Sequence, residues 1–157
     1  MKELQIRKAK TTDLEAVHQL VGDLARYEKA EEQFVATLAD YQRDFEAGIF
    51  EVLVAEIDET IVGMALYYMS YSTWKGRMLW LEDFVIKESW RGKGIGQLLF
   101  DTYVEEARLK ECRIVKWQVL DWNEPAVRFY EKKQAIIEKN WWNGKIFLTI
   151  PPKKQTD

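Results

Sequence analysis

The spacing of apolar residues predicts one strand and two helices at the start of the chain. Residues 4–9 alternate apolar and polar side chains, as a half-buried strand does. Residues 11–28 follow a helical period after a group of capping residues, and residues 35–48 predict a second helix that ends at Gly48. The face of the first helix that we expect to be buried contains Leu14, Val17, Val21 and Leu24.

The middle of the chain is rich in β-branched and aromatic residues. Residues 50–57 and 59–71 predict an antiparallel hairpin. A third β-rich run, residues 78–86, leads into a glycine-rich stretch and a predicted helix over 95–110. The buried stripe expected for that helix includes Ile95, Leu98, Leu99 and Tyr103.

The last third repeats the mixture of strands and helices. Residues 112–120 predict a strand, residues 124–133 a short helix, and residues 140–150 a closing hairpin that turns at Asn143 and Gly144. Hairpins followed by strand–helix–strand units predict an α/β fold in which a mixed sheet has helices on both faces. Because no linker-like segment divides the chain, we expect a single domain over 1–150, with a flexible tail over 151–157.

Composition excludes several classes of protein. The chain is 47% hydrophobic and 31% charged, which is typical of a globular domain. No apolar run approaches the roughly 20 residues of a membrane helix, and the N-terminus does not resemble a signal peptide, so we expect a cytoplasmic protein that does not bind membranes. With one cysteine and one histidine we expect no metal site, and the net charge of −3 argues against nucleic acid as a partner.

Residues 90–97, WRGKGIGQ, combine glycines and cations between a predicted strand and a predicted helix. A glycine-rich turn at a helix N-terminus lets several N–H groups converge, which favours phosphate binding. The spacing matches neither the G-x-x-x-x-G-K-[ST] loop of nucleoside triphosphatases nor the G-x-G-x-x-G turn of dinucleotide-binding proteins. The pattern that remains is Arg-x-x-Gly-x-Gly at Arg91, Gly94 and Gly96, which resembles the acyl-CoA pyrophosphate loop of the GNAT family of N-acetyltransferases.

The resemblance extends over nearly the whole chain, through the blocks RYEKAEEQ, YYMSYSTW, LWLEDFVI, WRGKGIG and DWNEPAVRFYEKKQA in that order. These blocks are similar to the diamine branch of the family, which contains the spermidine/spermine N-acetyltransferases and their thialysine-acetylating relatives. The sequence departs from the branch at Gln134, where glycine is usual. The resemblance implies a GNAT fold with a mostly antiparallel central sheet, and it implies a homodimer.

The implied activity is acetyl transfer from acetyl-CoA to a primary amine of a small diamine, polyamine or thialysine-like substrate, by direct attack. By resemblance, Tyr130 protonates or hydrogen-bonds the departing thiolate, and Glu82 holds the amine or accepts its proton through a water. Tyr27, Glu28 and Glu82 are the implied substrate-binding residues. The implied cofactor-binding residues are Phe84, Val85, Ile86, Arg91, Gly92, Lys93, Gly94, Ile95, Gly96, Gln97, Asn123, Glu124, Pro125 and Ala126.

Several neighbouring residues favour structural interpretations. Glu82 and Asp83 are consecutive in a strand, so their side chains should point to opposite faces unless the strand is bulged, and we expect Asp83 to be structural. The carboxylates of Glu28, Glu31 and Glu32 form either a solvated acidic surface or, together with Glu82, a wall that attracts a cation. We expect Cys112 to be a small buried filler rather than a nucleophile.

Two other functions remain open at this stage. A protein or peptide N-acetyltransferase would use the same chemistry on a different amine, and a non-catalytic acyl-CoA-binding protein would use only the loop. The sequence does not rank spermidine, putrescine, thialysine and lysine, because these amines differ by features that depend on pocket depth.

Overall fold

The computed structural model describes residues 3–148, so the predicted tail at 151–157 lies outside the described residues. Contacts divide the chain into two compact units, residues 1–120 and 121–157. The first unit contains one sheet in the order β1-β2-β3-β4-β5. Its strands are β1 (Leu4–Lys8), β2 (Glu51–Ile57), β3 (Thr60–Ser72), β4 (Gly76–Ile86) and β5 (Ile114–Trp117).

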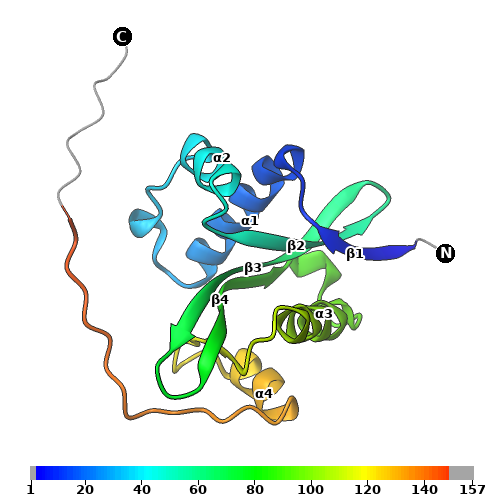
Figure 1. Cartoon of the computed structure of the whole chain (residues 1–157). Coiled ribbons are helices and arrows are strands. Elements are labelled where there is room, and N and C mark those ends of the chain that lie inside the picture. The colour runs from blue at the N-terminus through cyan, green and yellow to red at the C-terminus, as the bar shows by residue number, and fades with distance from the viewer. Residues whose placement is uncertain (1–2, 149–157) are drawn as a thin grey trace. The chain divides into compact units, whose positions relative to one another are not determined.

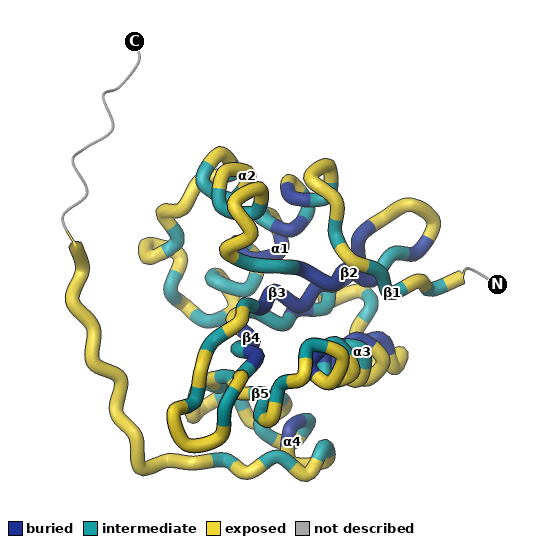
Figure 2. The backbone as a smooth tube through the Cα atoms, viewed as in Figure 1, coloured by how far each residue is buried: buried dark blue, intermediate teal, exposed yellow. Residues whose placement is uncertain are grey.

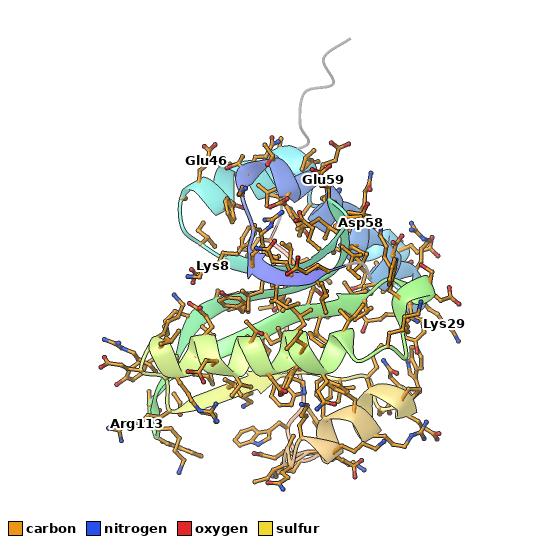
Figure 3. All side chains as sticks on the ribbon, turned by 90° about the vertical axis from the view of Figure 1, so that its right-hand side faces the viewer. Lys8, Lys29, Glu46, Asp58, Glu59 and Arg113 are labelled. Atoms are coloured by element: carbon orange, nitrogen blue, oxygen red, sulfur yellow. The ribbon has the colours of Figure 1, made fainter. Side chains whose placement is uncertain are left out.

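The predicted mixed sheet is confirmed. The pairs β1–β2, β2–β3 and β3–β4 are antiparallel, whereas β4 and β5 are parallel. The β2–β3 hairpin turns at Asp58 and Glu59, which are labelled in Figure 3 and both have positive φ (49° and 61°). Two successive residues of this kind are what a tight hairpin turn requires, because their twist matches that of the flanking strands.

Helices cover both faces of the sheet in the first unit (Figure 1). They are α1 (Leu14–Tyr27), α2 (Leu38–Glu46) and α3 (Ile95–Leu109), with short 3-10 turns η1 (Thr11–Asp13), η2 (Glu31–Gln33) and η3 (Glu88–Trp90). Helices α1 and α2 lie on one face and α3 lies on the other. The buried positions, dark blue in Figure 2, run along β2 and β3 between them.

The two faces of the sheet have separate apolar clusters. On the α1/α2 face, Val17 and Leu20 of α1 pack with Met64 and Leu66 of β3 and with Val85 of β4. On the α3 face, the cluster consists of Ala55, Ile57, Val62 and Ile95. The face on which a strand residue lies can therefore be read from the cluster that it joins.

An ion network ties β1 to the start of α1. The Arg7 guanidinium donates to both carboxylate oxygens of Asp13, at 2.7 and 3.0 Å, and to Glu56 Oε2 at 2.7 Å. Hydrogen bonding to Arg7 lowers the pKa of Asp13 below its ordinary value. All three side chains are largely shielded from solvent, so the network contributes more than an exposed ion pair would.

Two predicted details of the helices and strands differ in the structure. Leu98 is 47% exposed, and Phe100 (4% exposed) is buried in its place. The buried positions of α3 recur every four residues from Ile95, and Leu98 precedes the stripe by one residue. The strand predicted over 112–120 is limited to β5.

The second unit contains α4 (Glu124–Lys132), where a short helix was predicted. The closing hairpin predicted over 140–150 is not formed in the described part, because residues 135–148 contain no strand. A two-stranded hairpin alone is marginally stable in water, and here Trp142 and Phe147 are 96% and 78% exposed. Within residues 3–148, no helix combines the length and the apolar character needed to cross a bilayer.

Candidate active site

The glycine stretch forms the loop between β4 and α3. Gly92 and Gly94 adopt positive φ values of 74° and 82°, a conformation that favours glycine. An added Cβ at either position would meet no atom within 4 Å, so the main chain is open to a ligand. Gly94 also begins α3, whose first turn contains no acidic residue. Converging N–H groups at this helix N-terminus suit a phosphate or pyrophosphate.

Arg91 connects this loop to the end of α1. Its Nε donates to the backbone oxygen of Ile86 at 3.0 Å, and its guanidinium carbon lies 5.5 Å from the centre of the Tyr27 ring. The predicted cofactor residue Arg91 and the predicted substrate residue Tyr27 are therefore in contact. A groove of about 530 Å³ runs beside this contact, lined by Arg91 and Tyr27 together with Val85, Ile86 and Lys87.

The C-terminal half of β4 has one edge available for a ligand. Parallel pairing with β5 covers only Met78 to Leu81, whereas residues 83–86 pair with β3 alone among the described strands. No described strand therefore covers this edge of residues 83–86, although the Ile86 oxygen accepts from Arg91 Nε. A ligand with amide groups can lie along such an edge as an added strand does. The cofactor role implied for Phe84, Val85 and Ile86 stays a prediction.

Strand β4 contains a bulge between the two consecutive carboxylates. Leu66 pairs with Asp83 and Tyr67 pairs with Leu81, so Glu82 is an additional residue in β4 that has no opposite residue in β3. Cross-strand partners share a face, and Leu66 belongs to the cluster on the α1/α2 face. Asp83 therefore lies on that face.

Glu82 lies on the same face as Asp83. Its Oε2 accepts hydrogen bonds from the Tyr68 hydroxyl at 3.1 Å and from Trp80 Nε1 at 2.8 Å. Tyr68 is two residues after Leu66 in β3, so it too lies on the α1/α2 face. From the sequence, Glu82 and Asp83 were expected to point to opposite faces unless the strand is bulged. The bulge is present, and it brings both carboxylates to one side of the sheet.

The environment of Asp83 strongly disfavours its charge. Burial, followed by the negative charges of Glu82 and Glu28, raises the pKa of Asp83 from 3.8 to about 7. Burial also raises the pKa of Glu28, which follows the last residue of α1. The acidic group near the bulge thus contains Glu28, Glu82 and Asp83, whereas Glu31 and Glu32 are exposed on η2. Among residues 3–148, no group of carboxylates, histidines and cysteines is arranged to hold a metal ion.

Three aromatic residues at this site were not predicted from the sequence. Tyr68 and Trp80 bind Glu82, and burial together with the charges of Asp83 and Glu82 raises the pKa of Tyr41 on α2. The sequence carried a weak signal for Tyr68 and Trp80, since both lie in blocks that resemble the diamine branch, YYMSYSTW and LWLEDFVI. Their contact with Glu82 depends on the strand pairing.

The second unit contains the remaining predicted residues. Asn123 caps α4, since its side-chain oxygen accepts from the Ala126 N–H at 3.4 Å, and Pro125 occupies the first turn. Tyr130 is 7% exposed on the same helix, and its ring lies 5.4 Å from that of Phe129. The predicted residues in the first unit therefore come together around β4, and those in the second unit lie on one short helix.

Cys112 and His18 have structural surroundings. Cys112 Sγ lies 3.7 Å from the sulfur of Met69, and burial raises the pKa of its thiol, which opposes formation of a nucleophilic thiolate. His18 Nε2 lies 2.9 Å from the backbone oxygen of Ala36, and its ring packs between Phe34 and Tyr41. Neither residue provides a covalent route for acyl transfer.

Comparison with known proteins identifies similar chains. The acetyltransferase (GNAT) family matches residues 14–135. Thialysine N-epsilon-acetyltransferase of Bos taurus is 36% identical over 152 residues, which cover 89% of each chain. Spermidine/spermine N(1)-acetyltransferase-like protein 1 of Homo sapiens is 29% identical over 153 residues, which cover 90% of this chain and 22% of that protein.

The fold is also found among solved structures. An aminoglycoside acetyltransferase from an uncultured soil metagenomic sample, solved in complex with trehalose, superposes with a TM-score of 0.78. The superposition covers 93% of this chain and 97% of that one, at 20% sequence identity. This likeness shows a shared fold.

Proposed function

Since the chain belongs to the GNAT family of N-acetyltransferases, we propose that it transfers the acetyl group of acetyl-CoA to a primary amine of a small diamine, polyamine or thialysine-like compound. The observation that carries this proposal is the pair of carboxylates, Glu82 and Asp83, on one face of the sheet next to the edge of β4 that no described strand covers. A cationic amine that binds there lies beside the strand expected to hold the cofactor.

The residues present fit acetyl-CoA. The open main chain at Gly92 and Gly94 suits its pyrophosphate, and the edge of β4 at residues 83–86, which no described strand covers, suits the amide groups of its pantetheine arm. Bound acetyl-CoA supplies an activated acyl carbon with a thiolate leaving group. The remaining predicted residues of the loop, Lys93, Ile95, Gly96 and Gln97, surround the helix N-terminus, while Asn123 to Ala126 form the N-terminal turn of α4.

Glu82 holds the substrate ammonium. The two donors on Oε2 fix the orientation of its carboxylate, and Oε1 accepts no hydrogen bond from the described residues. Tyr27 supplies an aromatic surface at the end of α1, and Glu28 adds negative charge there. Tyr130 gives its hydroxyl proton to the departing thiolate, a role suited to a phenol whose ordinary pKa is about 10.

The acidic surroundings favour a small cation over a protein substrate. Three carboxylates near the bulge attract a diamine or polyamine, whose second amine remains charged during the reaction. The relatives named for thialysine and for spermidine or spermine support the same class of amine. A homodimer and a cytoplasmic location belong to the proposal. The exposed Tyr71 and Trp74 near the end of the β3–β4 hairpin support the dimer, which sedimentation of the purified protein tests.

Thiol release from acetyl-CoA tests the activity. The purified protein is assayed with spermidine, putrescine, thialysine, lysine and a basic peptide, and we expect saturable turnover with at least one small amine. Tyr130→Phe should lower kcat, and Glu82→Gln should raise the KM of the amine more than that of acetyl-CoA. Turnover of the peptide alone would move the proposal to a protein substrate, and acetyl-CoA binding without turnover would exclude an enzyme of this class.

A further inference from the structure

Building on the proposed function, we infer that Asp83 accepts the proton of the substrate ammonium, whereas Glu82 holds the amine in place. From the sequence, both roles were expected of Glu82, and Asp83 was expected to be a structural carboxylate. The β4 bulge changes this interpretation, because it places both side chains on the same face of the sheet. Either carboxylate can then reach the same amine, and their surroundings distinguish the two roles.

Asp83 has the surroundings of a base. Its cross-strand partner Leu66 and its neighbour Val85 are buried apolar residues, 6% exposed each. Within residues 3–148, no side chain pairs with its carboxylate and no donor hydrogen-bonds to it. A structural aspartate would bond a cation or cap a backbone donor, and Asp83 does neither. Its basicity is therefore available for a proton from the substrate.

Glu82 has the surroundings of a binder. One of its oxygens accepts hydrogen bonds from both Tyr68 and Trp80, and these bonds fix the orientation of the carboxylate. The side chain is exposed, so a cationic substrate can reach it from solvent. An exposed, oriented carboxylate is well placed to hold a cation.

The groups that face Asp83 keep its proton affinity in the useful range. Glu28 at the end of α1 and Glu82 on β4 add negative charge, while Tyr41 on α2 and Tyr68 on β3 are the neutral titratable groups that sense its charge. The resulting pKa of about 7 means that Asp83 is half ionised near neutral pH and can both take and release a proton.

The proton transfer balances as follows. The Asp83 carboxylate takes one proton from the ammonium, and the lone pair of the neutral amine attacks the acetyl carbon. As the C–N bond forms and the C–S bond breaks, the thiolate takes a proton from Tyr130, and the amide nitrogen returns one to the tyrosine oxygen. Asp83 then releases its proton to water, so that each turnover yields one amide, one thiol and one proton.

The pH dependence of kcat/KM for the amine distinguishes the two carboxylates. For the wild type we expect kcat/KM to fall below about pH 7 and to be level from pH 8 to 9. In Asp83→Asn the enzyme must use amine that is already neutral, about one molecule in 300 at pH 7.5 for an amine pKa of 10. We therefore expect kcat/KM of the variant to be about 300-fold below that of the wild type at pH 7.5 and to rise tenfold per pH unit up to pH 9. The change of slope near pH 7 in the wild-type profile, which we call the break, should be absent.

The matched variant Glu82→Gln should raise the KM of the amine about tenfold or more and keep the break near pH 7. Asp101→Asn, the same chemical change on the exposed face of α3, should leave the profile as in the wild type. Equal dissociation constants for acetyl-CoA in wild type and Asp83→Asn show that the variant is folded. If it does not fold, Asp83→Ser provides the same loss of the carboxylate.

The outcomes separate this inference from the proposed function. A wild type that turns over no amine of the panel overturns both. A wild type that is active, combined with an Asp83→Asn variant that keeps the break near pH 7, overturns the inference alone. Loss of the break in Glu82→Gln instead would assign the base to Glu82.

Discussion

Replacement of Asp83 by asparagine should stabilise the protein at alkaline pH. In the folded chain the ionised carboxylate is partly buried beside Leu66 and close to the charges of Glu28 and Glu82. In the unfolded chain it is solvated and has its ordinary pKa. Ionisation of Asp83 therefore costs free energy only in the folded state, and asparagine removes this cost while it keeps the shape of the side chain.

The pKa of Asp83 determines the magnitude and the sign of the effect. A rise from 3.8 to about 7 corresponds to at most about 4 kcal/mol, and we expect about 2 kcal/mol because the carboxylate remains partly accessible. Between these two pH values the folded state binds more protons than the unfolded state. The free energy of unfolding of the wild type should therefore decrease as the pH rises from about 4 to 7, relative to that of Asp83→Asn.

Urea unfolding of both proteins at pH 4 and pH 8 measures this difference. The variant should gain about 2 kcal/mol relative to the wild type between the two pH values, and Asp101→Asn serves as the control for the chemical change. An Asp83→Asn variant that is less stable than the wild type at pH 8, with no dependence on pH, would refute the reasoning. That result would mean that Asp83 makes a stabilising bond in the folded protein.

Three further predictions concern other parts of the chain. Gln134 has a φ of 64°, so Gln134→Gly should raise the free energy of unfolding by about 1 kcal/mol in urea titrations. Tyr27→Leu removes the ring under Arg91, so the KM values for amine and acetyl-CoA should both rise, by up to about tenfold, and by less in Tyr27→Phe. Asp13→Asn should cost about 2 kcal/mol at pH 7, and this difference should begin to decrease near pH 4 and vanish only as the pH falls through the pKa of Asp13 in the folded state, which Arg7 lowers. Equal unfolding midpoints for Asp13→Asn and wild type at pH 7 would contradict the last prediction.

Local pattern was sufficient to predict most elements of the first unit. The β-branched and aromatic residues of β2 and β3, and the glycines before α3, are signals contained in a few neighbouring residues, and the structure confirms them. Gln134 is a further case, because its left-handed backbone suits the glycine that the resemblance to the diamine branch led us to expect there. Such positions are specified by the local backbone.

The features that sequence reasoning missed depend on contacts between distant residues. The bulge is defined by two pairings between distant residues, Asp83 with Leu66 and Leu81 with Tyr67. The hydrogen bond between Glu82 and Tyr68 depends on the same strand pairing. The exposure of Leu98 depends on which face of α3 meets the sheet. The turn signal at Asn143 and Gly144 predicted a hairpin, but a turn signal does not supply a partner that buries its apolar side chains.

The bulge in β4 also determines how the strand responds to a change in length. On its two sides the residues alternate between the faces of the sheet, with Trp80 and Val85 on the α1/α2 face and Leu81 and Phe84 on the α3 face. If Glu82 were absent, the residues on its two sides would alternate regularly between the two faces of the sheet. Each core residue of β4 therefore lies on the same face whether or not the additional residue is present. Insertion of one residue, Glu82, is thus enough to place a second acidic side chain beside Asp83, and deletion of that residue removes it. In both cases the core residues of β4 stay on the same faces of the sheet.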